Sequence, residues 1–538
     1  MDPYYWILKN ELKFADTKAF ELKGRTWQIE PLRCNARRQC TMKGAQIGLT
    51  TVWILKTTHG MIYGKYPQGA FYLFPTSTNA DRFGKSKFSP LIAANPFINR
   101  YVRKTDTTTQ KQIGDSWLFL VGAREKQKIE GEKASSDILK TESADLDVFD
   151  EYDEMSEDMV ELALYRLNNS KVGQEAYLST PSIPEFGIHR KYLESDQRVW
   201  MIKCQKCGHE TCLEKEFPHC MGYYTVGNKT KWFRKCMKCD EKIFPRYGRW
   251  VAQYPDRSQD LVGWWISALA ALHTPVANPT AIMNKFHNPP EAGLAEVYNS
   301  FLGMPYIDAE HRLTPNDVFR CACDDLMVKR HDGPTCMGVD IGSNELHVVV
   351  AAKTSSRLLK VVYVAVLRGE DKYNLLHDLA KDFNCKCMVM DMHPETHKVK
   401  DFQRNESYAV WLCSYQKGEK HGPTTWHENT HEIHANRTEI LDASHELVKD
   451  PGRLEIPRID DKIKLFASQV AGVAKALVKE KDTKSEFYRY KNVGNSGAHY
   501  RHTLSYCMLA STKISRVRTG RGMRDFFMRV NQGTAMTS

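Results

Sequence analysis

The sequence predicts an α/β protein with two successive sheet domains, and three observations lead to this prediction. An apolar strand at 38–42 is followed by a glycine-containing loop and a helical segment at 50–58. A second apolar strand, at 146–150, ends in adjacent carboxylates. A separate run of strands and helices starts at 336, after a polar, proline-bearing stretch at 305–334. At about 150 residues per domain, a chain of 538 residues has room for three or four domains.

The loop after the first strand has most features of a phosphate-binding loop, with its lysine displaced. Against the pattern G-x-x-x-x-G-K-[ST], Gly48 and Thr50 fall on the second glycine and the magnesium-binding hydroxyl. Leu49 replaces the usual lysine, and Lys43 stands in the first glycine's place. Backbone N–H groups at a helix N-terminus hold phosphates whatever the side chains are, so Lys43 can supply the one ammonium still needed. Alone, the segment could also be a surface turn with an incidental lysine. The expected nucleotide-binding residues are Lys43, Gly44, Ala45, Gln46, Ile47, Gly48, Leu49 and Thr50.

The strand at 146–150 delivers two carboxylates at its end. We expect Asp150 to hold Mg²⁺ through water or the Thr50 hydroxyl, and Glu151 to polarise the attacking water. The alternative is an acidic helix N-terminus, because the whole neighbourhood is acidic. The next strand, at 175–181, ends in Ser-Thr-Pro, which is typical of the strand that carries hydrolysis to DNA movement in helicase-like motors.

The charge balance indicates a polyanionic partner. The formal net charge is +11, and a basic C-terminal segment begins at 516. No apolar run reaches the roughly 18 residues of a membrane span, and residues 1–20 lack the apolar core of a signal peptide. We therefore expect a protein of the cytoplasm that has no membrane partner.

Four of the 15 cysteines fall into two tight pairs, Cys204 with Cys207 and Cys236 with Cys239. In a chain without a secretion signal, this spacing is typical of a zinc ribbon, in which two knuckle turns point four thiolates at one metal. All four ligand positions are filled, so the zinc is expected to be structural and not catalytic. The alternative is a set of unrelated reduced cysteines. The competitors for ligand roles between the two pairs are Cys212, His219 and Cys220.

A second α/β pattern fills the last third of the chain. The strand at 336–340 ends in Asp340, two further strands and a helix follow, and the strand at 386–391 ends in Asp391. This order is how an RNase H-like fold places two carboxylates side by side, so that two metal ions about 4 Å apart can act on a phosphodiester. Either aspartate alone would more simply be a turn residue at a strand end.

The order of these motifs resembles the large terminase subunit of tailed bacteriophages, in particular the lambda-type family with an inserted zinc ribbon. The similarity covers most of residues 25–515. It rests on KGAQIGLT at 43–50, FDEYDEM at 149–155, LSTPSIPEFGIHRKYLESDQR at 178–198, GRW at 248–250, GWWISAL at 263–269 and GVDIGSNELHV at 338–348.

The resemblance implies an ATPase that drives double-stranded DNA into a procapsid and a metal-dependent endonuclease that cuts concatemeric DNA, in the host cytoplasm. Its cofactors would be ATP, Mg²⁺, Zn²⁺ and, at the nuclease site, Mg²⁺ or Mn²⁺. Its partners would be DNA, the small terminase subunit, the portal protein and further copies of the chain in a ring. The implied domains are a P-loop (ASCE/RecA-like) ATPase domain at 1–304 with the zinc ribbon at 200–245, a linker at 305–334, an RNase H-like nuclease domain at 335–515 and a basic tail at 516–538.

The resemblance also implies roles for further residues. Gln28 matches the place of a glutamine that contacts adenine. The sequence does not identify the arginine that acts on a neighbouring subunit, and Arg124 and Arg166 are the two candidates for it. His502 stands where such nucleases often carry a third acidic ligand, so it is expected to bind metal or to move a proton. It could also be an ordinary polar helix residue like its neighbour at 499. In that case the third ligand would be sought among Asp442, Asp460 and Asp461.

Two other functions use parts of the same pattern. A DNA repair or restriction translocase with a nuclease would share both sites but would have no portal partner. A non-enzymatic zinc-ribbon regulator would leave the four expected catalytic carboxylates without a use. A virion-assembly gene neighbourhood would separate the first two functions, and loss of ATPase activity in Glu151→Gln would separate both from the third.

Overall fold

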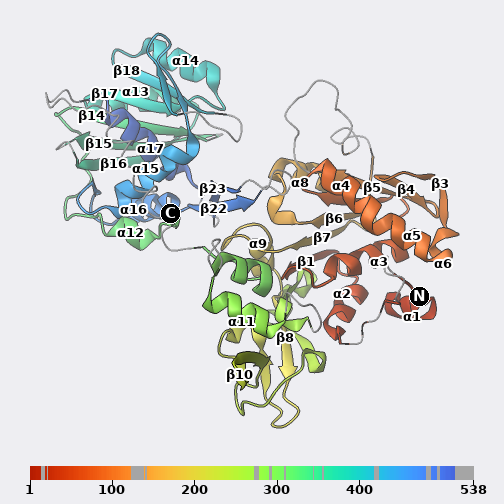
Figure 1. The fold of residues 1–538 in the computed structure, drawn as a ribbon. Coiled ribbons are helices and arrows are strands. Elements are labelled where there is room, and N and C mark those ends of the chain that lie inside the picture. Colours follow the sequence, from red (N-terminus) through yellow and green to blue (C-terminus); the bar gives the residue numbers. More distant parts are fainter. Residues whose placement is uncertain are drawn as a thin grey trace. The chain divides into compact units, whose positions relative to one another are not determined.

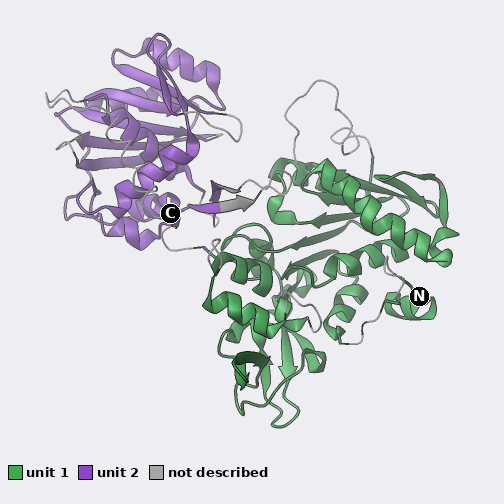
Figure 2. Ribbon diagram, in the orientation of Figure 1, with its two compact units in different colours: residues 1–306 green, residues 307–538 purple. Residues whose placement is uncertain are grey.

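The computed structural model describes residues 1–13, 19–20, 22, 24–122, 139, 142–271, 278–289, 294–307, 311–342, 344–353, 357–416, 423–479, 486–493 and 497–514. The chain forms two compact units, Met1–Tyr306 and Ile307–Ser538, coloured separately in Figure 2. Arg124 and the basic tail at 516–538 lie outside the described residues.

The described part of the first unit is built on an 11-stranded sheet with a parallel centre. In spatial order, its strands are β12 (Gly248–Ala252), β8 (Arg198–Lys203), β13 (Val262–Ile266), β1 (Arg38–Lys43), β7 (Gln174–Ser179), β6 (Leu146–Asp150), β2 (Ala70–Phe74), β5 (Ser116–Gly122), β4 (Gln110–Ile113) and β3 (Val102–Asp106), with β9 (Glu210–Cys212) paired to β8. Strands that are buried on both faces read as continuous apolar runs, as β2 and β13 do. Because β1, β7 and β6 are parallel neighbours, their carboxyl ends lie together at one edge of the sheet.

Helices cover both faces of this sheet (Figure 1). The larger apolar core joins the sheet to α1, α2, α3, α5 and α11, and the smaller one joins it to α8 and α9. The α-helices in the described part of this unit are α1 (Pro3–Lys9), α2 (Ile29–Arg33), α3 (Leu49–Ile62), α4 (Ser77–Phe83), α5 (Ser89–Ala94), α6 (Pro96–Asn99), α8 (Glu157–Leu164), α9 (Gly187–Glu194), α10 (Leu213–Glu216) and α11 (Pro279–His287).

Helix α3 is longer than its sequence suggests. It continues through Gly60 and ends at Ile62, whereas the glycine would be expected to end it. Gly60 has a packing role instead, because a Cβ there would lie 2.2 Å from the ring of Tyr66. The glycine therefore lets the loop after α3 approach the helix closely.

The segment that carries the cysteine pairs follows β8. It contains β9, α10 and an antiparallel hairpin of β10 (Met221–Val226) and β11 (Lys229–Arg234). The chain then returns to the main sheet through β12, which pairs antiparallel with β8. The cysteine segment is therefore an excursion from the edge of the main sheet.

The described part of the second unit contains an eight-stranded mixed sheet. Its spatial order is β19 (Thr425–His427), β20 (Glu432–Ala435), β18 (Ala409–Tyr415), β17 (Cys385–Asp391), β14 (Thr335–Ile341), β15 (Glu345–Lys353), β16 (Leu359–Arg368) and β21 (Leu454–Glu455), with a separate hairpin of β22 (Val473–Lys479) and β23 (Glu486–Asn492). β14 is antiparallel to β15 and parallel to β17, with Val339 opposite Met390. This register puts Asp340 and Asp391 on neighbouring strands at the same end.

Helices again flank both faces of this second sheet. α13 (Lys372–Asp382) and α14 (Thr396–Asn405) pack on one face. The other face carries α12 (Pro315–Phe319), α15 (Arg437–Lys449), α16 (Asp461–Val470) and α17 (His499–Ser511). Gly338 lets α17 lie directly on β14, since a Cβ there would be 2.0 Å from the Thr503 carbonyl oxygen and 2.4 Å from the Cys507 nitrogen.

The stretch at 305–334 differs from the linker that its composition suggests. The boundary between the units falls after Tyr306, and Leu313 and Val318 are buried in the core of the second unit. The reason is local: Thr314 and Asp317 form a capping box that starts α12 and turns its apolar side toward the core. Within the described residues, none of the helices is long and apolar enough to cross a membrane.

Candidate functional site

The phosphate loop joins the end of β1 to the start of α3. Lys43 is the last residue of β1, and Gly48, with φ of 81°, immediately precedes the helix. Glycine adopts this left-handed conformation at little cost, so the chain can turn there into the helix. The Leu49 side chain is buried in the core beneath the loop. An apolar residue therefore occupies the usual lysine position because its side chain faces inward.

Neighbouring backbone already binds the first two amides of the loop. The Gly44 N–H donates to the Ile266 carbonyl oxygen at 2.8 Å, and the Ala45 N–H donates to the Ser300 carbonyl oxygen at 2.6 Å. Gly44 has no room for a side chain, because a Cβ would lie 2.7 Å from both the Ala268 nitrogen and the Phe301 oxygen. The amides from Gln46 onward, at the N-terminus of α3, are then the candidates for holding phosphates.

Two side-chain contacts between residues far apart in the sequence assemble the expected chemical groups beside this loop. The Lys43 Nζ lies 3.7 Å from Glu151 Oε1, and the Thr50 hydroxyl donates to Asp150 Oδ1 at 3.3 Å. Asp150 is buried, and the Lys43 side chain is only 6% exposed. The structure therefore brings together all four residues from which the sequence predicted ATP chemistry.

The turn after Glu151 is anchored by a residue that the sequence analysis did not assign. Glu151 has φ of 61°, a left-handed conformation that is uncommon for a residue with a Cβ. Two residues later, Asp153 accepts hydrogen bonds from the Ser182 N–H at 2.8 Å, the Ser182 hydroxyl at 2.7 Å and the Ile188 N–H at 2.6 Å. Asp153 thereby ties this turn to the segment that follows Ser-Thr-Pro. In the sequence, only the repeated acidic residues of FDEYDEM at 149–155 indicated a role for Asp153.

Gln28 lies against the phosphate loop. Its side chain is fully buried, and Nε2 donates to the Ile47 carbonyl oxygen at 2.8 Å. Within the described residues, its Oε1 is buried without a hydrogen-bond partner, so it remains available to accept a bond from a ligand. Arg166 lies in the short helix η4 (Tyr165–Leu167) and is half-buried.

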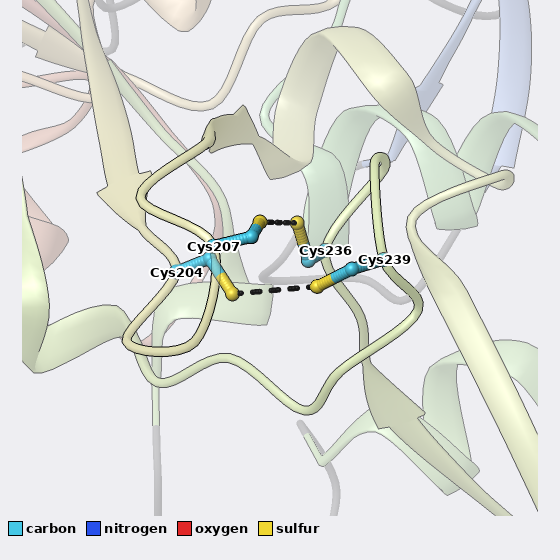
Figure 3. Close-up of side chains that lie close together, drawn as sticks. All are labelled: Cys204, Cys207, Cys236 and Cys239. Atoms are coloured by element: carbon cyan, nitrogen blue, oxygen red, sulfur yellow. Dashed lines mark hydrogen bonds between the residues drawn. The ribbon is translucent and has the colours of Figure 1, made fainter.

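The two cysteine pairs meet in one cluster, drawn in Figure 3. The Cys204 and Cys239 sulfurs are 3.7 Å apart, and the Cys207 and Cys236 sulfurs are 3.6 Å apart. All four sulfurs lie within 4.8 Å of one another. Zinc–sulfur bonds of about 2.3 Å in a tetrahedron place sulfurs roughly 3.8 Å apart, so the donor set fits zinc.

The competing cysteines have other partners. The Cys212 thiol is directed to Glu214 Oε2 at 3.6 Å, and the Cys220 thiol to the Leu213 carbonyl oxygen at 3.5 Å. Both thiols are buried, which raises their pKa values.

Asp340 and Asp391 lie side by side in the second unit. Burial raises the pKa of both carboxyls, and for Asp391 burial and the nearby negative charge of Asp340 raise the pKa to about 7. Two buried carboxyls placed this close, one of which raises the pKa of the other, form a site that favours a bound positive charge. A divalent cation would supply that charge, so the donor set fits the metal that the nuclease interpretation requires.

His499, at the start of α17, contacts Asp340, whereas the sequence predicted a metal-binding or proton-transfer role for His502. The His499 Nδ1–H donates to Asp340 Oδ2 at 2.7 Å, and this bond raises the pKa of the imidazole. The His347 ring stacks on it, with centroids 4.5 Å apart. The sequence contained an indication of this role for His499, because His499 and His502 share one face of the helix.

His502 is directed elsewhere. Its Nδ1 is hydrogen-bonded to the Tyr415 hydroxyl at 2.7 Å, and burial lowers its pKa to about 3. His502, Asp340 and Asp391 do not form a cluster whose ligand atoms all lie within 4.8 Å. His499 and His502 are one helical turn apart on α17. The packing of α17 on β14 directs His499 to Asp340 and His502 to Tyr415. One turn further along α17, the Tyr506 hydroxyl donates to Asp391 at 3.4 Å.

The three other aspartates considered as a third ligand have separate structural partners. Asp442 accepts from the Tyr490 hydroxyl at 2.8 Å and pairs with Lys475 at 2.9 Å. Asp460 caps α16, and Asp461 pairs with Lys464 on the exposed side of that helix. These contacts explain all three residues without a metal.

Comparison with known proteins agrees with this geometry. Residues 27–253 match the family model described as phage terminase large subunit gpA, ATPase domain. No curated protein matches the chain. The large terminase of bacteriophage HK97 has 10% sequence identity and a TM-score of 0.53, and the match covers 94% of this chain and 100% of that chain.

Two further solved structures have lower TM-scores. The large terminase of a thermophilic bacteriophage has 12% identity and a TM-score of 0.32, with 92% of this chain and 98% of that chain covered. The large terminase nuclease of the thermophilic phage G20c has 10% identity and a TM-score of 0.25, with 38% and 99% covered. The segment that carries the phosphate loop and its carboxylates is therefore similar to the ATPase domain of phage terminase large subunits, and the fold of the chain is similar to that of the HK97 large terminase.

Proposed function

We propose that this chain is the large subunit of a viral DNA-packaging motor, with an ATPase that translocates double-stranded DNA and a metal-dependent endonuclease that cuts concatemers. One observation carries the proposal: Lys43, Thr50, Asp150 and Glu151 converge on one loop inside the segment that matches the terminase ATPase model. A repair or restriction translocase would need the same groups, but the family match favours packaging.

At the nucleotide site, each residue has a distinct role. The amides at the start of α3 hold the phosphates, and Lys43 adds the positive charge that the β and γ oxygens need. Thr50 and Asp150 would hold Mg²⁺, which neutralises phosphate charge when bound. Glu151 orients the attacking water, and Gln28 offers a buried acceptor for the adenine amino group.

At the nuclease site, Asp340 and Asp391 would hold Mg²⁺ or Mn²⁺, which activates water and stabilises the leaving oxygen of a phosphodiester when bound. His499 orients Asp340 through its hydrogen bond and contributes positive charge beside the carboxylates. The sequence-based assignment of His502 as a metal ligand or proton-transfer group remains a separate proposal; because its Nδ1 is hydrogen-bonded to Tyr415, that role would fall to Nε2.

The remaining assignments concern zinc and partners. We propose that Cys204, Cys207, Cys236 and Cys239 hold one structural Zn²⁺ in a ribbon of the lambda type. The small terminase subunit, the portal protein and other copies of the chain in a ring are the proposed partners, in the host cytoplasm. The net charge of +11 suits a protein that works on DNA.

The decisive experiment measures both activities in the same purified chain. ATP hydrolysis is followed with and without linear double-stranded DNA, and DNA cleavage is followed with Mg²⁺ and with Mn²⁺. Glu151→Gln should lose hydrolysis and keep cleavage, and Asp340→Asn should show the opposite pattern. If the parent chain hydrolyses no ATP under any of these conditions, the motor assignment is wrong.

A further inference from the structure

The four-cysteine segment contacts the phosphate loop through one short piece of chain. This piece, residues 266–271, runs from the end of β13 through the short helix η7 (Ala268–Ala270). On one side it packs on the loop, where the Ile266 carbonyl accepts from the Gly44 N–H and the Ala268 nitrogen leaves no space for a side chain on Gly44. We call residues 266–271 the loop support.

Glu214 binds the loop support from the cysteine segment. It lies in α10, between the two cysteine pairs in sequence, and is 2% exposed. Its Oε1 accepts from the Ser267 N–H at 2.8 Å and from the Ser267 hydroxyl at 2.7 Å. A buried carboxylate that receives two donors fixes the backbone that supplies them, because losing either bond leaves a buried polar group unpaired.

Arg234 binds the other end of the loop support. It is the last residue of β11, two positions before Cys236, and its side chain is buried. Its Nε donates to the Leu269 carbonyl oxygen, and its Nη2 donates to the Ala271 carbonyl oxygen at 2.9 Å. Glu214 and Arg234 together hold residues 267–271 through four hydrogen bonds.

The metal site joins the two arms of this clamp. Glu214 follows the first cysteine pair, and Arg234 precedes the second pair. The four sulfurs that bring the pairs together lie within 4.8 Å of one another. In a small segment of this kind, metal binding and local folding are the same event.

We propose that the four-cysteine segment is a positioning element for the nucleotide site: metal binding closes the Glu214–Arg234 clamp, the clamp fixes the loop support, and the support holds the phosphate loop in its binding shape. The proposal rests on the proposed ATPase function. It goes beyond a purely structural zinc because it makes metal occupancy and nucleotide affinity interdependent.

Interdependence of this kind is reciprocal. If zinc strengthens ATP binding by some factor, bound nucleotide strengthens zinc binding by the same factor, and such factors are typically about 5- to 150-fold. The non-hydrolysable analogue AMP-PNP should therefore slow the release of zinc from the wild-type chain to a colorimetric chelator. Conversely, removing zinc should weaken AMP-PNP binding about tenfold, as measured by titration calorimetry.

Variants locate the effect in the clamp. Glu214→Leu should retain zinc and weaken AMP-PNP binding about tenfold, Glu214→Gln should recover most of the affinity, and Ser267→Ala should lose a smaller part. Glu210→Gln is the matched control, because Glu210 lies in the same segment and pairs with Arg249 at the surface. Circular dichroism and zinc analysis establish that each variant is folded and loaded.

The possible results separate the proposals. Equal AMP-PNP affinity in zinc-loaded and zinc-free folded chain, or zinc release that AMP-PNP does not change, overturns the coupling and leaves the ATPase assignment intact. A zinc-loaded parent chain that binds no nucleotide overturns the ATPase assignment itself. If Glu214→Leu does not fold, the zinc-release measurement on the wild-type chain still decides the matter.

Discussion

The Lys43 ammonium lies 3.7 Å from the Glu151 carboxylate, although Lys43 ends β1, Glu151 follows the last residue of β6, and β7 separates these two strands in the sheet. In a parallel sheet, ligands bind in the crevice beyond the carboxyl ends of the strands. Lys43 stands at the start of the phosphate loop, whereas the usual lysine stands at its end. The contact with Glu151 shows that the Lys43 ammonium still lies beside the carboxyl end of β6.

Removing the Lys43 charge should abolish ATP hydrolysis. Lys43→Ala is expected to reduce the rate by about 100-fold or more, which is typical for the loss of one preorganised group that stabilises transition-state charge. The measurement is steady-state phosphate release. Lys85→Ala is the control, because Lys85 is an exposed lysine paired within its own helical segment. Hydrolysis at the parental rate in Lys43→Ala would show that the phosphate loop is assigned wrongly.

Glu151→Gln should bind ATP but hydrolyse it slowly. The amide keeps the shape of the side chain and loses the charge that orients water, and losing a group that promotes proton transfer costs about 10²- to 10⁴-fold. Calorimetry with AMP-PNP should give an affinity at least equal to that of the parent, because Lys43 no longer pairs with the carboxylate. A variant that loses binding instead would make Glu151 part of the binding site and not of the hydrolytic step.

Local chemistry made parts of both sites predictable from the sequence. The strand, loop and helix around Gly48 follow from short-range signals, because a left-handed glycine before an apolar helix leaves few alternatives. The cysteine knuckles are equally local: two residues between thiols fix the turn that directs both to one point. The structure brings both sets of residues together as their spacing indicates.

Other features of the two sites depend on contacts between residues far apart in the sequence, and these could not be predicted from sequence patterns. The choice between His499 and His502 depends on how α17 lies across β14, which Gly338 permits at close range. No sequence pattern indicates the hydrogen bond from the Ala45 N–H to the Ser300 carbonyl oxygen, because the two residues lie far apart in the sequence. The Glu214 clamp was missed for the same reason, since its partner Ser267 lies 53 residues away.

Neutralising either nuclease carboxylate should abolish DNA cutting while ATP hydrolysis continues. Asp340→Asn and Asp391→Asn each remove a metal-binding charge, so cleavage of linear DNA with Mg²⁺ or Mn²⁺ should fall to background on a gel. ATPase activity should stay near parental, because both residues lie in the second unit. Asp378→Asn, at an exposed position of α13, is the control. Cleavage that survives both changes would place the nuclease site elsewhere.

Loss of the zinc ligands should destabilise the first unit. Cys236→Ser is expected to lower zinc content from one ion per chain and to lower the melting temperature, because closed thiolate sites couple metal binding to folding. Cys321→Ser is the control, since that thiol lies in the second unit and is hydrogen-bonded to the backbone carbonyls of Asp317 and Val448. Folded parent chain that contains no zinc on metal analysis would remove the assignment.

The two histidines of α17 provide the sharpest test of the second site. His499→Ala removes the donor to Asp340 and should reduce cleavage or metal affinity by about 10- to 100-fold, the usual cost of losing a residue that orients a metal ligand. His502→Ala removes the hydrogen bond and the ring contact with Tyr415, and it should leave cleavage within a few-fold of the parent. Cleavage rates are compared across Mg²⁺ and Mn²⁺ concentrations, which separates weaker metal binding from a slower chemical step. If His502→Ala is the more damaging change, or alone alters the metal preference, the imidazole of His502 acts at the metal and α17 must shift when the nuclease is loaded.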